Sequence, residues 1–247
     1  MKSRFAIAGL AAVMPFTVGC SDHAFLGSEP PWWQADYETG DFSQWQQSGT
    51  IGTNVSRDGM LAIVESPVHS GHYAARSSTN TGNPSYARLY LQDNLPVEAY
   101  YSVWFYIPTQ YAVGQYWNVF EFSGRSDPTN ANTGMAIWSL DLRHGSTGEL
   151  VWYVYDDVGS RELKPGNPVM APIGRWFRVQ AFVRQATDLT GRVSFWIDDA
   201  LFIDQRAVST VPSAWMAWSV GSAAGQMPQP ADLYIDDAGI WRTDAAN

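Results

Sequence analysis

The run YWNVFEFSGR, residues 116–125, holds a single carboxylate, Glu121, among aromatic and branched residues. Side chains alternate between the two faces of a β-strand, so Val119 and Ser123 are its neighbours on one face. A carboxylate on an open sheet face can transfer a proton, accept hydrogen bonds from sugar hydroxyls or simply be solvated. A glycosidase needs two carboxyl groups across the scissile bond, and this strand supplies one. We therefore expect Glu121 to be a polar contact in a sugar groove, although neighbouring strands could add Asp141, Glu149 or Asp156.

Sugar binding requires flat rings for the apolar faces of the sugar and polar groups for its hydroxyls. If the strand parities hold, one concave sheet could present eight such side chains, which are Arg88, Tyr90, Trp117, Glu121, Tyr153, Tyr155, Arg178 and Gln180. The alternative is ordinary packing between sheets, because some of the 12 tryptophans must be buried. Both interpretations require a β-sheet scaffold.

Period-two patterns recur along the chain and predict at least eight strands. They are SYARLYLQ, AYYSVWFYI, YWNVFEF, MAIWSLDL, ELVWYVY, RWFRVQAFVR, RVSFWID and DLYIDDAGIW. Turn-like stretches rich in Gly, Pro, Asn and Asp separate them, and no window shows sustained helical periodicity. The sequence therefore predicts an all-β fold, a single antiparallel β-sandwich of the jelly-roll type.

The amino-acid composition and the absence of certain motifs argue against several classes of partner and cofactor. The 247 residues are 45% hydrophobic, with 12 Trp, 12 Tyr and 11 Phe, and the formal net charge is −9. The acidic balance argues against nucleic acid as a partner and against a polybasic membrane patch. We find no phosphate loop, no Cys/His cluster and no nucleophile turn, so no organic cofactor is expected.

Residues 1–19 have a basic start, Lys2 and Arg4, followed by an apolar run that predicts an export signal. The ending TVGC resembles a bacterial lipoprotein cleavage box, which implies lipidation of Cys20; the alternative is an ordinary secretory signal with a chance cysteine. Residues 20–34 read as a tether and 35–247 as the jelly-roll domain. A lipid-anchored protein of the bacterial cell envelope or exterior is expected, with the bilayer as a partner through the anchor.

Four stretches together carry a family resemblance: DYETGDFSQW, SPVHSGHYAAR, GRWFRVQAFVRQATDLTGRVSFWIDDALFID and LYIDDAGIW. Their order resembles the concanavalin A-like lectin/glucanase jelly rolls, in particular bacterial polysaccharide lyase-like proteins of the heparin lyase I and glucuronan lyase type. The resemblance covers roughly residues 35 to 242. It implies the fold, whereas lectins, hydrolases and lyases all use this scaffold.

For a lyase, the resemblance implies neutralisation of a uronate carboxylate and proton transfer by His or Tyr. Related lyases carry a Gln and His pair where this sequence has Glu121 and Ser123. The remaining lyase candidates are Tyr155 and His72 for proton transfer, and Arg178 or Arg88 for the carboxylate.

The two ends of the domain also resemble jelly-roll carbohydrate-binding modules that hold a structural Ca²⁺. The matching residues are Glu38 in YETG and Asp236 in YIDD. Ca²⁺ binds six to eight hard oxygens, which carboxylates and carbonyls of abutting strands could provide. The alternative is turn chemistry, in which these carboxylates cap backbone amides.

The sequence alone thus favours an exported, lipid-anchored glycan-binding protein that holds polysaccharide on a concave aromatic sheet without catalysis. The alternative from another class is a polysaccharide lyase acting by β-elimination on a uronate-containing glycan. A third candidate is a structural surface module.

Overall fold

The computed structural model describes residues 30–92, 95–127, 133–213 and 215–243. The predicted signal segment 1–19 and Cys20 lie outside these residues. Within the described part, the chain forms β-strands and one short 3₁₀ turn, η1 (Ser43–Trp45), and no helix there is long and apolar enough to cross a membrane. The all-β prediction is confirmed.

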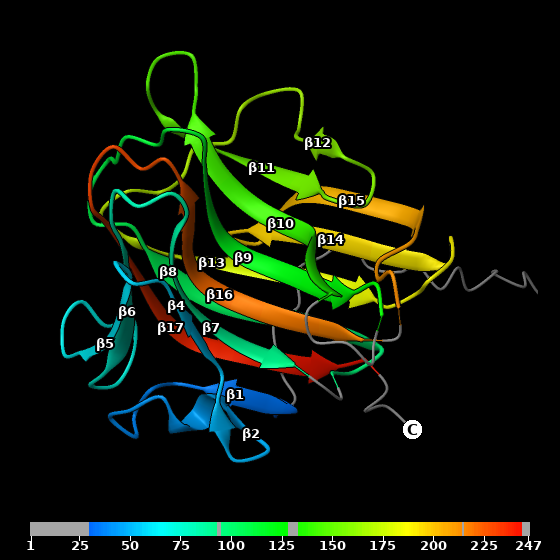
Figure 1. Ribbon diagram of the computed structural model, residues 1–247, viewed down its shortest axis with the longest axis horizontal. Helices are drawn as coiled ribbons and strands as arrows, with labels where there is room; N and C mark the ends of the chain where they lie inside the picture. Colours follow the sequence, from blue (N-terminus) through cyan, green and yellow to red (C-terminus); the bar gives the residue numbers. More distant parts are fainter. Residues whose placement is uncertain (1–29, 93–94, 128–132, 214, 244–247) are drawn as a thin grey trace, which may run out of the picture.

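Two antiparallel sheets form the sandwich (Figure 1). The eight-stranded sheet runs in the order β15 (Ala200–Val208), β14 (Gly191–Ile197), β13 (Trp176–Arg184), β8 (Glu98–Tyr106), β17 (Ala231–Arg242), β6 (Ala74–Thr79) and β5 (Met60–Val64), and β1 (Trp33–Ala35) also pairs with β17. Because β1 begins at Trp33, two residues assigned to the tether belong to this sheet.

The seven-stranded sheet runs in the order β12 (Arg161–Leu163), β11 (Leu150–Asp156), β10 (Gly134–His144), β9 (Tyr116–Arg125), β16 (Met216–Gly225), β7 (Ser85–Gln92) and β4 (Thr53–Val55). Strands β9, β10 and β16 curve together across the middle of this sheet in Figure 1. A small hairpin, β2 (Gln46–Gln47) and β3 (Thr50–Ile51), forms a separate two-stranded sheet next to β7, where the backbone N–H of Gln92 donates to Gln47 Oε1.

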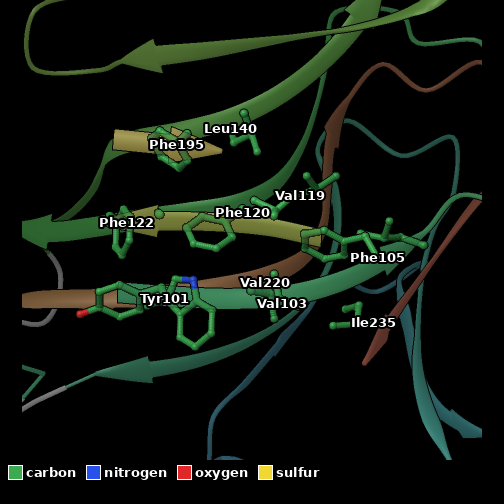
Figure 2. Close-up of a cluster of buried hydrophobic side chains, with 14 of the residues drawn as sticks. Tyr101, Val103, Phe105, Val119, Phe120, Phe122, Leu140, Phe195, Val220 and Ile235 are labelled. Carbon is green, nitrogen blue, oxygen red and sulfur yellow. The ribbon is translucent and has the colours of Figure 1, made fainter. Parts of the chain in front are cut away.

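Rings from both sheets fill the space between them (Figure 2). Phe120 and Phe122 of β9 meet Phe195 of β14 with ring centroids 5.8 and 6.4 Å apart, and Tyr101 of β8 lies 4.9 Å from Phe122. Edge-to-face contacts of this kind add to the stabilisation that burial of large apolar surfaces provides. Alternate residues of each strand are thereby committed to the core, and the other half faces outward.

Candidate active site

The open face of the seven-stranded sheet carries a cavity of about 450 Å³. Side chains of strands β7, β9, β10 and β11, together with one residue just before β9 and one just after β11, line it. They are Arg88, Gln115, Tyr116, Asn118, Glu121, Ala136, Ser139, Asp141, Tyr153, Tyr155 and Asp157. Four predicted site residues, Arg88, Glu121, Tyr153 and Tyr155, therefore meet in one cavity.

An irregularity in the middle of β9 decides which of its residues face this cavity. The pairing register shifts between Leu140 and Asp141 on one side of β9 and between Val220 and Ala223 on the other. Consequently Asn118 and Glu121, three residues apart, both line the cavity, although strict alternation would separate them.

Trp117 was predicted on the same face as Glu121, and the structure corrects this. Its side chain is fully buried in the core, and its indole N–H donates to Ser222 Oγ at 3.1 Å. The shift on the β16 side includes Gly221, whose φ of +122° disfavours other residues. A Cβ at Gly221 would lie 2.5 Å from the carbonyl oxygen of Ala87, so this close approach of strands needs glycine.

A chain of polar contacts fixes the centre of the cavity. Arg88 Nη1 lies 2.9 Å from Glu121 Oε2, and Arg88 Nη2 donates to Asn118 Oδ1 at 2.6 Å. The Asn118 amide nitrogen donates in turn to Asp141 Oδ1 at 2.7 Å. These bonds hold the guanidinium in one orientation with its charge partly exposed to the cavity.

Burial perturbs the titration of the acids around Arg88. Burial, reinforced by the Glu121 charge, raises the pKa of Asp141 to about 7 despite its bond from Asn118. Burial and the Glu121 charge also raise the pKa of Asp157, which accepts a hydrogen bond from Ser139 Oγ at 3.3 Å. The site is thus rich in carboxyl groups that repel one another.

Three tyrosines in the cavity differ in their surroundings. Burial and the nearby Asp141 carboxylate raise the pKa of Tyr153. Burial also raises the pKa of Tyr116, and the positive charge of Arg88 offsets only part of that rise. Tyr155 is partly exposed at the cavity wall. Perturbed acids and phenols beside a fixed cation are typical of catalytic sites.

Two further cavities lie beside the central one, and the first of them is continuous with it. One of about 180 Å³ shares Arg88 and Glu121 with the central cavity and is otherwise lined by Asn54, Tyr90, Gln92, Ser123, Trp215, Ala217 and Ser219. The other, of about 390 Å³, lies around β10 and β11 and includes Arg143, His144, Trp152 and Lys164. Tyr90, a predicted binding residue, thus lies in the groove next to Arg88.

Arg178 and Gln180 were predicted on the binding sheet, but both belong to β13 of the opposite sheet. Arg178 pairs with Asp199 and its guanidinium lies 5.9 Å from the ring of Trp104, while Gln180 is buried. The parity within β13 was correct, with Phe177 and Val179 in the core. Periodicity gives the face of a strand and not the sheet to which the strand belongs, which is why this prediction was wrong.

His72 lies in the loop between β5 and β6, on the edge of the eight-stranded sheet and away from the lining of the groove. Its backbone N–H donates to Glu38 Oε1 at 2.8 Å, and the N–H of Tyr73 donates to the same oxygen at 2.9 Å. His72 therefore lies in a loop that Glu38 holds and does not line the cavity that contains Arg88 and Glu121.

Asp236 holds the same loop from its other end. Its Oδ2 accepts the backbone N–H of His69 at 2.9 Å and that of Ser70 at 3.3 Å, and Oδ1 accepts the N–H of Asp237. A carboxylate oxygen that accepts an amide N–H keeps a further lone pair for a cation. The described residues contain no cluster of three or more His, Cys, Asp or Glu side chains able to hold a metal. As arranged here, Glu38 and Asp236 fit the capping of backbone amides better than Ca²⁺ ligation.

Several cavity residues were not among the predicted binding residues. Tyr116 and Asn118 lie in the same strand as Glu121, and only the register shift brings Asn118 to this face. Asp157 follows β11, and Asp141 was considered only as a second carboxyl group. The alternation of Ser139, Asp141 and Arg143 with Leu140 and Leu142 was the one sequence signal for a polar face on β10.

The similarity to known proteins agrees with this architecture. The family model described as polysaccharide lyase matches residues 37–238. No curated protein matches the chain at the level of sequence.

Three solved structures illustrate the shared fold. The endo-β-1,4-glucuronan lyase of the fungus Trichoderma reesei has a TM-score of 0.64 at 17% identity, covering 87% of this chain and 97% of its own. The cellulose induced protein Cip1 has 0.57 at 13% identity, covering 84% and 95%, and the alginate lyase of Aplysia kurodai has 0.56 at 11% identity, covering 87% and 100%. At these sequence identities the structural likeness establishes the fold, which is the fold that the sequence resemblance implied. The family is established by the family model, which matches most of the chain. The chain belongs to the polysaccharide lyase family.

Proposed function

We propose that this protein cleaves a uronate-containing polysaccharide by β-elimination in the groove of the seven-stranded sheet. The observation that carries the proposal is the presence of a fixed arginine, Arg88, and of the phenol groups of Tyr116 and Tyr155 in one cavity of about 450 Å³. Family membership supports this alternative over the glycan-binding protein without catalysis that the sequence alone favoured.

Arg88 is the partner for the uronate carboxylate. Elimination begins at C5, next to that carboxylate, and the C5 proton becomes more acidic when the carboxylate charge is neutralised. Arg88 is already oriented by Glu121 and Asn118, so little reorganisation is needed when substrate binds. The amide of Asn118 and the carboxyl of Asp141 complete the polar wall behind it.

Tyr116 is the candidate for proton transfer. Tyr116 must first lose its own proton to solvent, which burial opposes and the charge of Arg88 favours. Its oxygen then removes the C5 proton, the C5–H electron pair forms the C4–C5 double bond, and the C4–O4 bond breaks. The leaving O4 takes up a proton, which Tyr116 or a second cavity tyrosine returns. Tyr155, predicted from the sequence as the base or acid, lines the same cavity and is that second candidate.

The residues predicted to bind sugar that line these cavities form the substrate subsites of the enzyme. Glu121 orients Arg88 and accepts hydroxyl hydrogen bonds, while Tyr90 and Tyr153 provide rings on either side. The substrate class, a polysaccharide, is the partner that the family implies. Export and the lipid anchor at Cys20 would bring such an enzyme to polymers outside the cytoplasm, and they remain part of the proposal.

The test compares three variants in which a tyrosine loses only its hydroxyl: Tyr116→Phe, Tyr155→Phe and Tyr153→Phe. Each is incubated with uronate polymers while the ultraviolet absorbance of the unsaturated product is followed. We expect Tyr116→Phe to lose activity by at least about a hundredfold, the usual contribution of a positioned general acid or base, with polymer binding retained. Full activity of Tyr116→Phe would refute the assignment, and loss in Tyr155→Phe alone would transfer the role to Tyr155.

A further inference from the structure

We infer that the preferred substrate carries uronates that are each flanked by neutral sugars, and not an unbroken run of uronates. This inference rests on the proposed lyase function and names the substrate class of the same groove. It follows from the distribution of charge along the central cavity and the two cavities beside it.

Arg88 lies where the central and the 180 Å³ cavities meet, since it lines both. Among the described residues that line these two cavities, Arg88 is the one cation, and Glu121 already balances its charge. One guanidinium can accommodate one sugar carboxylate at the centre of the groove. A second carboxylate on a neighbouring sugar would find no further cation within these cavities.

The wall on the β10 and β11 side of Arg88 is acidic. Asp141 and Asp157 line it together with Glu121. Burial, and to a smaller extent the Glu121 charge, raises the pKa of both aspartates, so a further negative charge beside these three acids is unfavourable. A uronate in this part of the cavity would meet carboxylates of its own sign. A neutral sugar would instead donate hydroxyl hydrogen bonds to them and pack on Tyr153 or Tyr155.

The cavity on the β7 and β16 side is neutral. Asn54, Gln92, Ser123 and Ser219 line it. Ser219 is buried, and its hydroxyl has no hydrogen-bond partner within the described part of the chain. An unsatisfied buried hydroxyl in a cavity wall is costly unless a ligand or water reaches it, and a sugar hydroxyl supplies such a partner.

In addition to Tyr90, Trp215 provides an aromatic ring in this cavity. The guanidinium of Arg125 lies 4.0 Å from the centre of its ring, so one face of the indole is backed by a cation and the ring is held in place. Fixed indole rings suit the apolar faces of neutral sugars. Both neighbours of the Arg88 subsite therefore fit uncharged sugars.

Beyond the acidic wall, cationic side chains are present again in the 390 Å³ cavity. Arg143 and Lys164 line the 390 Å³ cavity, and both pair with the single carboxylate of Glu162, with Arg143 Nη2 2.8 Å and Lys164 Nζ 2.8 Å from Oε1. The group keeps a net positive charge. Arg143 also lies 4.9 Å from the ring of Tyr153, which connects this cavity to the acidic wall. The order of cation, acidic wall and cation matches a polymer in which uronate and neutral sugar alternate.

The test compares kcat/KM of the full chain on three polymers: glucuronan, alginate, and an unsulfated polymer of alternating glucuronate and N-acetylglucosamine. We expect a preference of about tenfold or more for the alternating polymer, because tenfold corresponds to a modest like-charge repulsion. Equal or better cleavage of glucuronan or alginate would overturn the inference and leave the lyase function standing. Failure of a folded protein to cleave any uronate polymer would overturn the proposed function, and this inference with it.

Asp157→Asn tests the charge argument directly. Asp157 is a wall residue, and the substitution removes one negative charge while keeping the shape of the side chain. We expect kcat/KM on glucuronan or alginate to rise toward the value for the alternating polymer. Glu65→Gln makes the same change of charge in an exposed residue outside the groove lining and should leave the ratio unchanged. An unchanged ratio in Asp157→Asn would also overturn the inference.

Discussion

Replacement of Asp141 by Asn should make the protein more stable above neutral pH. Asp141 is 5% exposed and accepts a hydrogen bond from the Asn118 amide at 2.7 Å. Asn is nearly isosteric and its carbonyl oxygen can accept the same bond. The substitution therefore removes a charge from a buried position with little change in packing.

The magnitude follows from the pKa of Asp141, which rises from 3.8 to about 7 in the folded state. Because the folded state binds this proton more tightly, its contribution to the free energy of unfolding is complete below the unfolded pKa and is lost as the pH rises through the folded pKa. At about 1.4 kcal/mol per pKa unit, ionisation of Asp141 costs about 4 kcal/mol above pH 7. Removal of that cost would raise Tm by roughly 10 °C for a domain of this size.

Thermal unfolding of wild type and Asp141→Asn at about pH 5 and about pH 8 provides the measurement. We expect the difference in Tm to be about two to three times larger at the higher pH, because at pH 5 part of the cost is already present through ionisation of Asp141 in the unfolded state. Asp58→Asn is the matched control, because the Ser56 hydroxyl lowers the pKa of Asp58 and no gain is expected there. The same Tm difference at both pH values, or no difference at either, would refute the conclusion that burial raises the pKa of Asp141.

Three further predictions concern the core, the ends of the domain and the leader. Trp117→Ala should lower the free energy of unfolding by about 3 to 5 kcal/mol in denaturant titrations, because it empties a large buried site; a change below about 1 kcal/mol would mean that Trp117 is exposed. If Ca²⁺ binds at Glu38 and Asp236, EDTA should lower Tm and Asp236→Ala should remove that response, whereas an unchanged Tm and no co-purifying metal would reject the site. Mass spectrometry of the exported protein should find a lipid on Cys20 and none in Cys20→Ser; an unmodified Cys20 in the wild type would contradict the anchor.

The strands were largely predictable because the alternation of residue types follows directly from the geometry of a half-buried sheet. SYARLYLQ is β7, and the runs around Glu121 and Phe177 are β9 and β13. The predictions omitted β16, MAWSVGSAAG, whose small residues show no clear alternation and whose ten positions are all buried. That strand lies between β7 and β9 and so brings Arg88 to Glu121.

The site itself was only half predictable. Arg88, Tyr90, Glu121, Tyr153 and Tyr155 were assigned to one face correctly, because their strands keep regular alternation around them. The register shift in β9 that places Trp117 in the core depends on the pairing of β9 with β10 and β16. The residue pattern within β9 does not predict this shift. The positions of Arg178 and Gln180 depend on sheet order, which is a property of the whole topology.

The most direct test of the account is the chemical identity of the product released from a uronate polymer. Elimination leaves a double bond at the new non-reducing end, so each such fragment is lighter by one water than the corresponding product of hydrolysis. We predict that mass spectrometry will find these unsaturated fragments with the wild type and not with Tyr116→Phe. Saturated fragments would show that the carboxyl groups around Glu121 act in hydrolysis, and saturable binding without any fragment would show a glycan-binding protein; either result would contradict the proposed lyase.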